Sequence, residues 1–171
     1  LGVLVPGAEE AIAQTHSGKV GILATRGTVD SGAYIREIHR INPDITVFQQ
    51  AAPLLVPLVE SNALQYIEPM LSDYIAPLLA EDIDTLVLGC THYPMFKEHL
   101  RQKLGDKVAI VSQDELVPIK LADYLRRHPE IDQKLSKNGT RRYLVTDLAP
   151  STSEVARCLF GAEVNLEKVA L

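Results

Sequence analysis

Apolar and polar residues along the chain repeat with two different periods, one typical of buried strands and one typical of amphipathic helices. Short runs of apolar and β-branched residues predict strands at 1–5, 19–24, 45–48, 85–88, 108–111, 142–146 and 162–169. Apolar residues spaced three or four positions apart predict helices at 8–15, 30–41, 64–79, 94–104, 115–127 and 152–160. This alternation predicts an α/β fold with a mostly parallel sheet flanked by helices.

Several residues that interrupt or begin helices refine this outline. Pro69 and Pro77 fall inside the third predicted helix, and because proline cannot donate a backbone hydrogen bond, we expect a kink or two shorter helices there. Ser151 and Glu154 have the S-x-x-E spacing of a capping box, which predicts the start of the last helix. The polar stretch 128–139 predicts a long exposed connection before it.

The stretch from residue 85 to residue 94 is the one around which the chain is organised. Its apolar, β-branched beginning predicts a buried strand that ends at Gly89, and Pro94 suits the first position of a helix. Cys90 is therefore expected just past the carboxyl end of a strand and just before a helix. Open α/β sheets bind their ligands at that place.

This placement predicts chemistry for Cys90 and its two neighbours. A thiol near backbone N–H groups and the positive end of a helix dipole favours its thiolate form, so we expect the pKa of Cys90 to fall. Thr91 adds a hydroxyl, and His92 adds an imidazole that can hydrogen-bond to a substrate or share a proton. The alternative is a buried cysteine at a strand end with an incidental histidine.

The composition of the chain mainly excludes certain classes of protein. With 171 residues, 46% of them hydrophobic, the chain can bury a sizeable core as one large domain or two small ones. Its net charge of −5 gives no basic footprint for nucleic acid, and no apolar run approaches the roughly 20 residues that a membrane span needs. The two cysteines could pair, but we favour reduced thiols in a cytoplasmic protein. We see no secretory leader, and the strand-like opening without a methionine leads us to expect residues upstream.

One motif and two supporting segments resemble a known family. Leu88-Gly-Cys-Thr-His-Tyr-Pro94 resembles the second catalytic motif of the glutamate racemases, which are cofactor-independent enzymes of bacterial cell-wall synthesis. Residues 21–34 and 57–61 resemble the middle segment of the same family, in the same order. The related aspartate racemases usually carry an acidic residue at the position of His92, so the His-Tyr-Pro ending favours glutamate.

The resemblance also implies an architecture. Glutamate racemases have two similar α/β domains that face each other across a cleft, and their chain returns to the first domain at its end. By this resemblance, residues 1–112 form the second racemase domain, and residues 113–171 pack on a first domain that is missing here. The implied partners are glutamate and the missing amino-terminal half, and a homodimer is left open.

The activity implied by the resemblance is the interconversion of L- and D-glutamate for peptidoglycan. Two cysteines exchange protons with the α-carbon from opposite faces, and Cys90 matches the second of them. The first precedes Asn-Thr in the family, and no Cys-Asn-Thr occurs in this sequence, so we expect the chain alone to be inactive. Cys158 lies in a predicted amphipathic helix and is interpreted as a packing residue. The resemblance implies a reaction without metal or cofactor, and the sequence agrees with it, because it shows no Cys/His cluster with metal-ligand spacing and no lysine that stands out as a Schiff-base candidate.

Three further residues take roles only through the resemblance. Glu60 matches an acidic residue that lies near the motif histidine in the family and could orient His92; the alternative is a glutamate favoured by the dipole at a helix start. Thr25 and Thr28 resemble substrate-side threonines that could bind a carboxylate. Their alternative is N-capping by Thr28, Asp30 or Ser31.

Two other functions remain open from the sequence. The chain could be a complete one-cysteine enzyme of the same superfamily, such as a decarboxylase, a hydrolase or a related racemase, in which Cys90 works alone. It could also be a non-catalytic binding fragment that keeps the fold. Residues upstream of this chain discriminate among these hypotheses, because Asp-Ser-Gly and Cys-Asn-Thr segments there would support the two-cysteine racemase.

Overall fold

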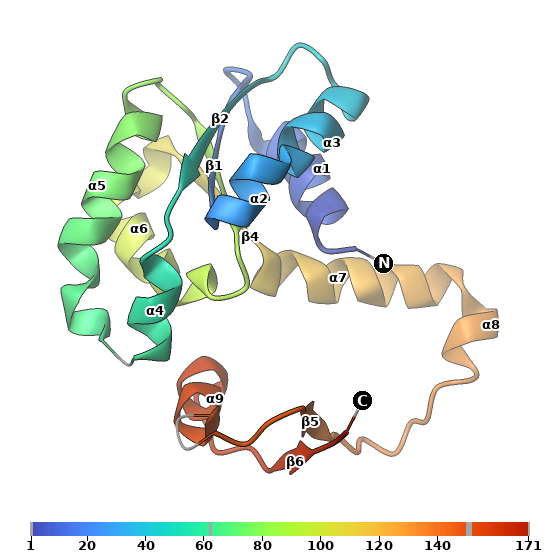
Figure 1. The fold of residues 1–171 in the computed structure, drawn as a ribbon. Helices are drawn as coiled ribbons and strands as arrows, with labels where there is room; N and C mark the ends of the chain where they lie inside the picture. The colour runs from blue at the N-terminus through green and yellow to red at the C-terminus, as the bar shows by residue number, and fades with distance from the viewer. Residues whose placement is uncertain (1, 62, 150–151, 171) are drawn as a thin grey trace.

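The fold is built on a four-stranded parallel sheet with helices on both faces (Figure 1). The computed structural model of the chain describes residues 2–61, 63–149 and 152–170. The strands lie in the order β2-β1-β3-β4, and they are β1 (Lys19–Ala24), β2 (Thr46–Ala51), β3 (Thr85–Gly89) and β4 (Ala109–Ser112). Each of these four strands lies within a few residues of the bounds predicted for it. The predicted α/β fold with a mostly parallel sheet is therefore confirmed.

Helices cover both faces of this sheet. The α-helices are α1 (Leu4–Gln14), α2 (Arg26–Ser31), α3 (Ala33–Ile41), α4 (Leu55–Glu60), α5 (Ile67–Leu79), α6 (Lys97–Leu104), α7 (Gln113–Arg127), α8 (Pro129–Asp132) and α9 (Thr152–Phe160). Short 3-10 helices are η1 (Leu64–Tyr66), η2 (Tyr93–Phe96) and η3 (Gly105–Lys107). In Figure 1, α1 and α3 lie on one side of the strands, and α5 and α6 lie on the other.

Alternating side chains of the strands fill two separate hydrophobic clusters. Val20 and Ile22 of β1 are fully buried among residues of α1 and α3, while Leu23 is fully buried among residues of α4, α5 and α6. Burying each such side chain contributes about 1.5–3 kcal/mol to stability. Because both faces of the sheet are covered, the carboxyl ends of the strands form a rigid edge on which loops can carry chemistry.

The beginning of the chain differs from the prediction. The strand predicted at 1–5 is wrong for the described residues, because α1 already begins at Leu4; residue 1 lies outside them. The helix buries small side chains, among them Ala8 and Ala11, and Leu4 packs against the same cluster. These residues are spaced by four and three positions, which is a helical period. Pro6 fits because the first turn of a helix needs no backbone donor there.

Proline and capping residues account for the remaining differences in the main domain. Residues 64–79 form η1 followed by one continuous α5, with Pro69 in its first turn and Pro77 inside it. The helices α2 and α4 were not predicted as separate elements. Thr25 starts α2 by accepting a hydrogen bond from Thr28 N at 3.4 Å. A helix of six residues offers too few turns for a periodic pattern.

The last part of the chain forms a small unit of its own. After α7 and α8, a connection without regular structure leads to β5 (Tyr143–Val145), which pairs in parallel with β6 (Leu166–Lys168). Figure 1 shows β5, β6 and α9 lying apart from the main sheet, with α9 below α4 and the two strands below α7. The serine of the predicted capping box, Ser151, lies outside the described residues. Two surface ion pairs, Arg142–Glu167 at 2.6 Å and Lys168–Asp147 at 2.8 Å, hold this unit internally.

At the edge of the main sheet formed by the amino ends of its strands, Asp84 fixes the turn between α1 and β1. Its carboxylate accepts hydrogen bonds from Thr15 Oγ1 at 2.6 Å, His16 N at 2.8 Å and Ser17 N at 2.6 Å. Burial alone would raise the pKa of Asp84, but these donors outweigh burial and hold its pKa well below the ordinary value. The carboxylate therefore stabilises the fold only while it is ionised.

We expect Asp84→Asn to lower the free energy of unfolding by about 1–2 kcal/mol near pH 7, because hydrogen bonds to a charged group are lost. The folded-state pKa is depressed, so the stabilisation is complete above the unfolded pKa of about 4 and declines as pH falls below it. Urea unfolding between pH 7 and pH 3 measures both effects. Asp82→Asn, at an exposed position, is the matched control and should change stability by less than about 0.5 kcal/mol. Equal losses in the two variants would contradict the proposed role of Asp84.

Candidate functional site

The site lies at the point in the sheet where the connections between successive strands run in opposite directions. The chain leaves β1 toward β2 on one side and leaves β3 toward β4 on the other. Ala24 and Gly89 end these two central strands and lie opposite each other in the ladder. Thr25 and Cys90 follow them directly, so both residues are at the carboxyl edge, where the strand order reverses. That is the place where open α/β sheets bind ligands.

The segment from Cys90 to Phe96, which we call the Cys90 loop, is held by backbone hydrogen bonds and by a buried tyrosine. Tyr93 N donates to Cys90 O at 3.2 Å, and Met95 N donates to His92 O at 3.3 Å. The Tyr93 side chain is fully buried, and its hydroxyl donates to Ala52 O at 2.9 Å. These bonds stabilise the conformation of the loop, because a buried tyrosine hydroxyl that left its acceptor would lose a hydrogen bond without gaining water.

Cys90, His92 and Glu60 form a continuous chain of contacts. Cys90 Sγ lies 3.9 Å from His92 Nδ1, and His92 Nε2 lies 3.3 Å from Glu60 Oε1. When Nε2 carries the proton, it donates to Glu60, and Nδ1 is left to accept a proton from the thiol. Thr91 Oγ1 lies 3.5 Å from the same Nδ1. The structure thus brings together four residues that the sequence had selected.

The position of Glu60 excludes one interpretation made from the sequence. Glu60 is the last residue of α4 and does not lie at a helix start, so the alternative of a dipole-favoured glutamate is wrong. A carboxylate at the carboxyl end of a helix faces the negative end of the dipole. The favourable contact of Glu60 is therefore with His92, as the family resemblance implies.

The electrostatics of Cys90 differ from the prediction. Burial raises the pKa of the Cys90 thiol above its ordinary value, and the nearby Glu60 carboxylate raises it further. The N–H groups of Thr91, His92 and Tyr93 act in the opposite direction but do not outweigh burial. The expected fall in pKa is thus wrong for this chain, because the sulfur is half-buried. A thiolate here needs a proton acceptor or a cation close by.

The two threonines predicted to bind substrate lie at the same edge of the sheet. Thr25 Oγ1 and Thr28 Oγ1 are 3.0 Å apart, and each side chain is half-buried. The N-cap of α2 is Thr25, whereas the alternative from the sequence had named Thr28, Asp30 and Ser31 as capping residues. Ser31 Oγ accepts a hydrogen bond from Ala33 N at 3.2 Å, where α3 begins. The capping role explains the Thr25 position without a ligand, and a binding role for either threonine remains a prediction.

Sequence reasoning missed the residues that fix the Cys90 loop from its sides. Tyr34 of α3 is buried, and its ring lies against Gly89, the residue before Cys90. Its hydroxyl accepts a hydrogen bond from Gln113 Nε2 at 3.2 Å. A signal was present, because Tyr34 ends one of the segments that resemble the racemase family. Lys97, at the start of α6, pairs with Asp114 and Glu115 of α7, and no pattern in the sequence marked it.

Among the residues that the structure describes, no group of three or more His, Cys, Asp and Glu side chains is arranged to hold a metal ion. Across residues 2–61, 63–149 and 152–170, none of the helices has the length and apolarity that crossing a bilayer requires. The side chain of Cys158 lies outside the described part, so its interpretation as a packing residue stays a prediction.

The parallel sheet and the cysteine at its edge define an α/β protein with a thiol-centred site. A family model described as Asp/Glu/Hydantoin racemase matches residues 1–116. The chain belongs to this racemase family.

Individual proteins that match this chain are glutamate racemases. A curated glutamate racemase from Neisseria meningitidis serogroup C is 56% identical over 174 residues, which cover 100% of this chain and 64% of that protein. The crystal structure of glutamate racemase isoform RacE1 from Bacillus anthracis matches with a TM-score of 0.88 and 34% identity, over 100% of this chain and 64% of that one. Glutamate racemase from Francisella tularensis, solved in complex with D-glutamate, matches with a TM-score of 0.84 and 27% identity, over 98% and 62% of the two chains. This chain thus spans less than two thirds of the length of these proteins.

Proposed function

We propose that this chain supplies one of the two thiols of a glutamate racemase, with Cys90 serving one face of the α-carbon. The contact chain of Cys90, His92 and Glu60 at the carboxyl edge of the sheet carries this proposal. The solved glutamate racemases with the same fold support glutamate as the substrate, since one of them holds D-glutamate. We place the activity in the cytoplasm, where D-glutamate is supplied for peptidoglycan.

The reaction follows from one thiolate and one thiol on opposite sides of the substrate. Cys90 as thiolate takes the α-proton of one enantiomer: the C–H bond breaks, an S–H bond forms, and the electron pair stays on the α-carbon and its carboxylate. The second cysteine, in the amino-terminal half, donates its proton to the opposite face and becomes a thiolate. In the reverse direction the two cysteines exchange roles. The reaction as proposed uses no cofactor.

His92 resolves the difficulty that burial creates for Cys90. Because the pKa of the buried thiol is raised, a free thiolate is costly at neutral pH. His92 Nδ1 accepts the thiol proton and leaves an imidazolium beside the thiolate, and Glu60 stabilises that imidazolium through Nε2. Once Nδ1 carries this proton, it is also a donor for a substrate carboxylate bound at the same edge.

The hydroxyls at the edge of the sheet complete the proposed binding site. Thr25, Thr28 and Thr91 all follow the ends of the two central strands. Their hydroxyl and N–H groups are donors that suit a carboxylate and the negative charge that develops in the transition state. We therefore assign Thr25, Thr28, Thr91 and His92 to substrate binding.

The division of the chain into two parts also belongs to this proposal. Residues 1–112 form the second racemase domain, and residues 113–171 pack on the amino-terminal half. Large apolar side chains are exposed along this second part, and they include Ile119, Leu121, Leu144 and Phe160, which are 67%, 43%, 51% and 56% exposed. Contact with the amino-terminal half would cover these side chains.

The experiment that tests the function compares the chain with a completed protein. We expect the 171-residue chain to leave L-glutamate and D-glutamate unchanged in D2O, because one of the two acid–base groups is absent. A fusion that adds, upstream of residue 1, the part of the Neisseria meningitidis relative that this chain does not match should interconvert the enantiomers and incorporate deuterium. Chiral chromatography and mass spectrometry follow both changes. Interconversion by the chain alone, or none by the fusion, would overturn the two-thiol proposal.

One observation favours a second function. The Cys90–His92–Glu60 contacts are complete within this chain and need no residue from elsewhere. A one-cysteine enzyme of the same superfamily, such as a decarboxylase that protonates a carbanion from one face, needs only such a group. Release of CO2 from an α-substituted malonate by the 171-residue chain, lost in Cys90→Ser, would favour this alternative.

A further inference from the structure

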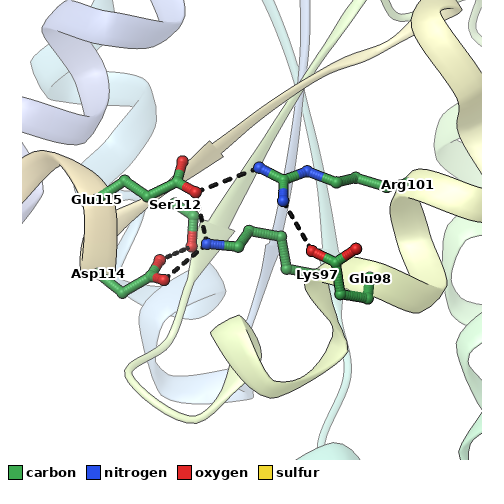
Figure 2. Close-up of polar contacts among 6 residues, drawn as sticks. All are labelled: Lys97, Glu98, Arg101, Ser112, Asp114 and Glu115. Atoms are coloured by element: carbon green, nitrogen blue, oxygen red, sulfur yellow. Dashed lines mark hydrogen bonds and ion pairs between the residues drawn. The ribbon is translucent and has the colours of Figure 1, made fainter.

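The first turn of α7 contacts the two flanks of the Cys90 loop. On one flank, Lys97 follows the loop directly, and its Nζ lies 2.7 Å from Asp114 Oδ2 and 2.7 Å from Glu115 Oε1 (Figure 2). Arg101 extends this network, because one of its nitrogens lies 3.2 Å from Glu115 Oε1. Figure 2 also shows Ser112 Oγ bonded to the other oxygen of Asp114, which fixes that carboxylate.

The Lys97 contacts differ from ordinary surface ion pairs in the burial of one partner. The Lys97 side chain is only 12% exposed and meets two carboxylates at once, while the Asp114 and Glu115 side chains are 42% and 49% exposed. Exposed pairs contribute little because both side chains remain mobile in water, whereas the packed stem of Lys97 limits the positions that its ammonium can take. Lys97 is therefore held to α7 by a strong geometric constraint.

On the other flank, α7 reaches the loop through Tyr34. Gln113, the first residue of α7, donates to the Tyr34 hydroxyl at 3.2 Å. The ring of Tyr34 lies so close to Gly89 that a Cβ there would be 3.1 Å from Tyr34 Cε2. Gly89 directly precedes Cys90, so this contact lies at the start of the loop, and the contacts of Lys97 lie at its end.

Between these two contacts, α7 and the loop do not pack tightly. An open pocket of about 310 Å³ lies between them, with Thr91 and Pro94 on the loop side and Val117 and Pro118 on the α7 side. Side chains that face each other across a pocket of this size make few direct apolar contacts. The helix and the flanks of the loop are therefore connected by the polar contacts of Lys97 and Gln113.

We propose that the first turn of α7 sets the position of the Cys90 loop and that Lys97 is its positioning residue. The inference rests on the proposed function in that Cys90 is taken as the proton-transfer thiol. Because α7 continues into residues 128–171, the helix that contacts the loop also carries the part of the chain proposed to join the amino-terminal half. Through Lys97, that part of the chain can then act on the position of the thiol.

The test uses Lys97→Met, which removes the charge, and Lys97→Arg, which keeps it. Lys103→Met is the matched control, because Lys103 lies on the same helix but pairs with Glu68 of α5 at 3.1 Å. We expect backbone amides of residues 90–96 to exchange hydrogen about five-fold faster in Lys97→Met, with no change in β1 and none in Lys103→Met. In the fusion protein, kcat should fall about ten-fold while KM changes less than about two-fold, because the substrate still binds but the sulfur is misplaced. Lys97→Arg should restore kcat to within about three-fold.

Two results would overturn this inference. One is equal hydrogen exchange of residues 90–96 in Lys97→Met and Lys103→Met. The other is faster exchange in Lys97→Met that extends to β1, because that would show a general loss of stability and no specific positioning. Hydrogen exchange is measured on the 171-residue chain and needs no turnover. Faster loop exchange in Lys97→Met with no racemisation by the unmodified fusion would therefore keep the positioning role and reject the proposed function.

Discussion

Replacing Cys90 by serine in the fusion protein is expected to lower glutamate interconversion about 10³-fold, the range lost when a positioned acid–base group is removed. A serine hydroxyl is a far weaker acid than a thiol and cannot serve as the base in this contact chain. The remaining cysteine still faces the opposite side of the α-carbon. One enantiomer should therefore keep exchanging its α-hydrogen with D2O without inversion, while the other should stop exchanging.

Cys158→Ser is the matched control for this experiment, because it makes the same substitution at the other cysteine of the chain. We expect it to keep both the interconversion and the deuterium exchange of the two enantiomers. Mass spectrometry of each enantiomer after incubation in D2O measures the asymmetry. Loss of exchange from both enantiomers to the same extent in Cys90→Ser, or full retention of inversion, would show that Cys90 does not serve one face.

The second large effect is expected at Gly89, the residue that joins β3 to the Cys90 loop. A Cβ at this position would lie 3.0 Å from Ala24 Cβ and 3.1 Å from Tyr34 Cε2. Neither neighbour can move easily, because Ala24 belongs to β1 and Tyr34 is buried and hydrogen-bonded. Gly89→Ala should therefore lower the free energy of unfolding by about 2–3 kcal/mol, as overpacking does, and shift the start of the loop.

Gly27→Ala provides the control for that prediction. A Cβ at Gly27 would meet no atom within 4 Å, and the residue lies in the helix α2. Alanine favours helices over glycine, so this variant should be unchanged or up to about 1 kcal/mol more stable. Denaturant unfolding monitored by circular dichroism measures both variants. If Gly89→Ala were as stable as Gly27→Ala, the close approach of β1 and Tyr34 to the Cys90 loop would be wrong.

The sheet could be predicted from the sequence because its strands are short apolar runs bounded by turn residues. The bounds of β1 were predicted correctly at 19–24, and β3 was one residue longer than predicted. Errors occur where apolar residues are too few to show a period. The first residues look like a strand by composition, but the small side chains of Ala8 and Ala11 continue their pattern as a helix. The six-residue helices α2 and α4 give no periodic signal at all.

The candidate site could be predicted only as far as neighbours in sequence and a family motif allow. Cys90, Thr91 and His92 are adjacent in the chain, and Glu60 was added by resemblance; the structure places all four in one contact chain. The pKa of Cys90 was predicted in the wrong direction, because burial by distant residues is invisible in a local pattern. The contacts of Lys97 with α7 join residues 17 and 18 positions apart, and only the fold reveals such pairs.

The order of the strands has a consequence for how the protein is made. All strands of the main sheet, and the loop that carries the sulfur, precede residue 113. A ribosome releases the amino end first, and domains generally fold as units while synthesis continues. The strands of the sheet can therefore pair before the final 59 residues, 113–171, have emerged. If α7 positions the Cys90 loop as proposed, the loop takes its final place only late in biosynthesis, when the first turn of α7 reaches it.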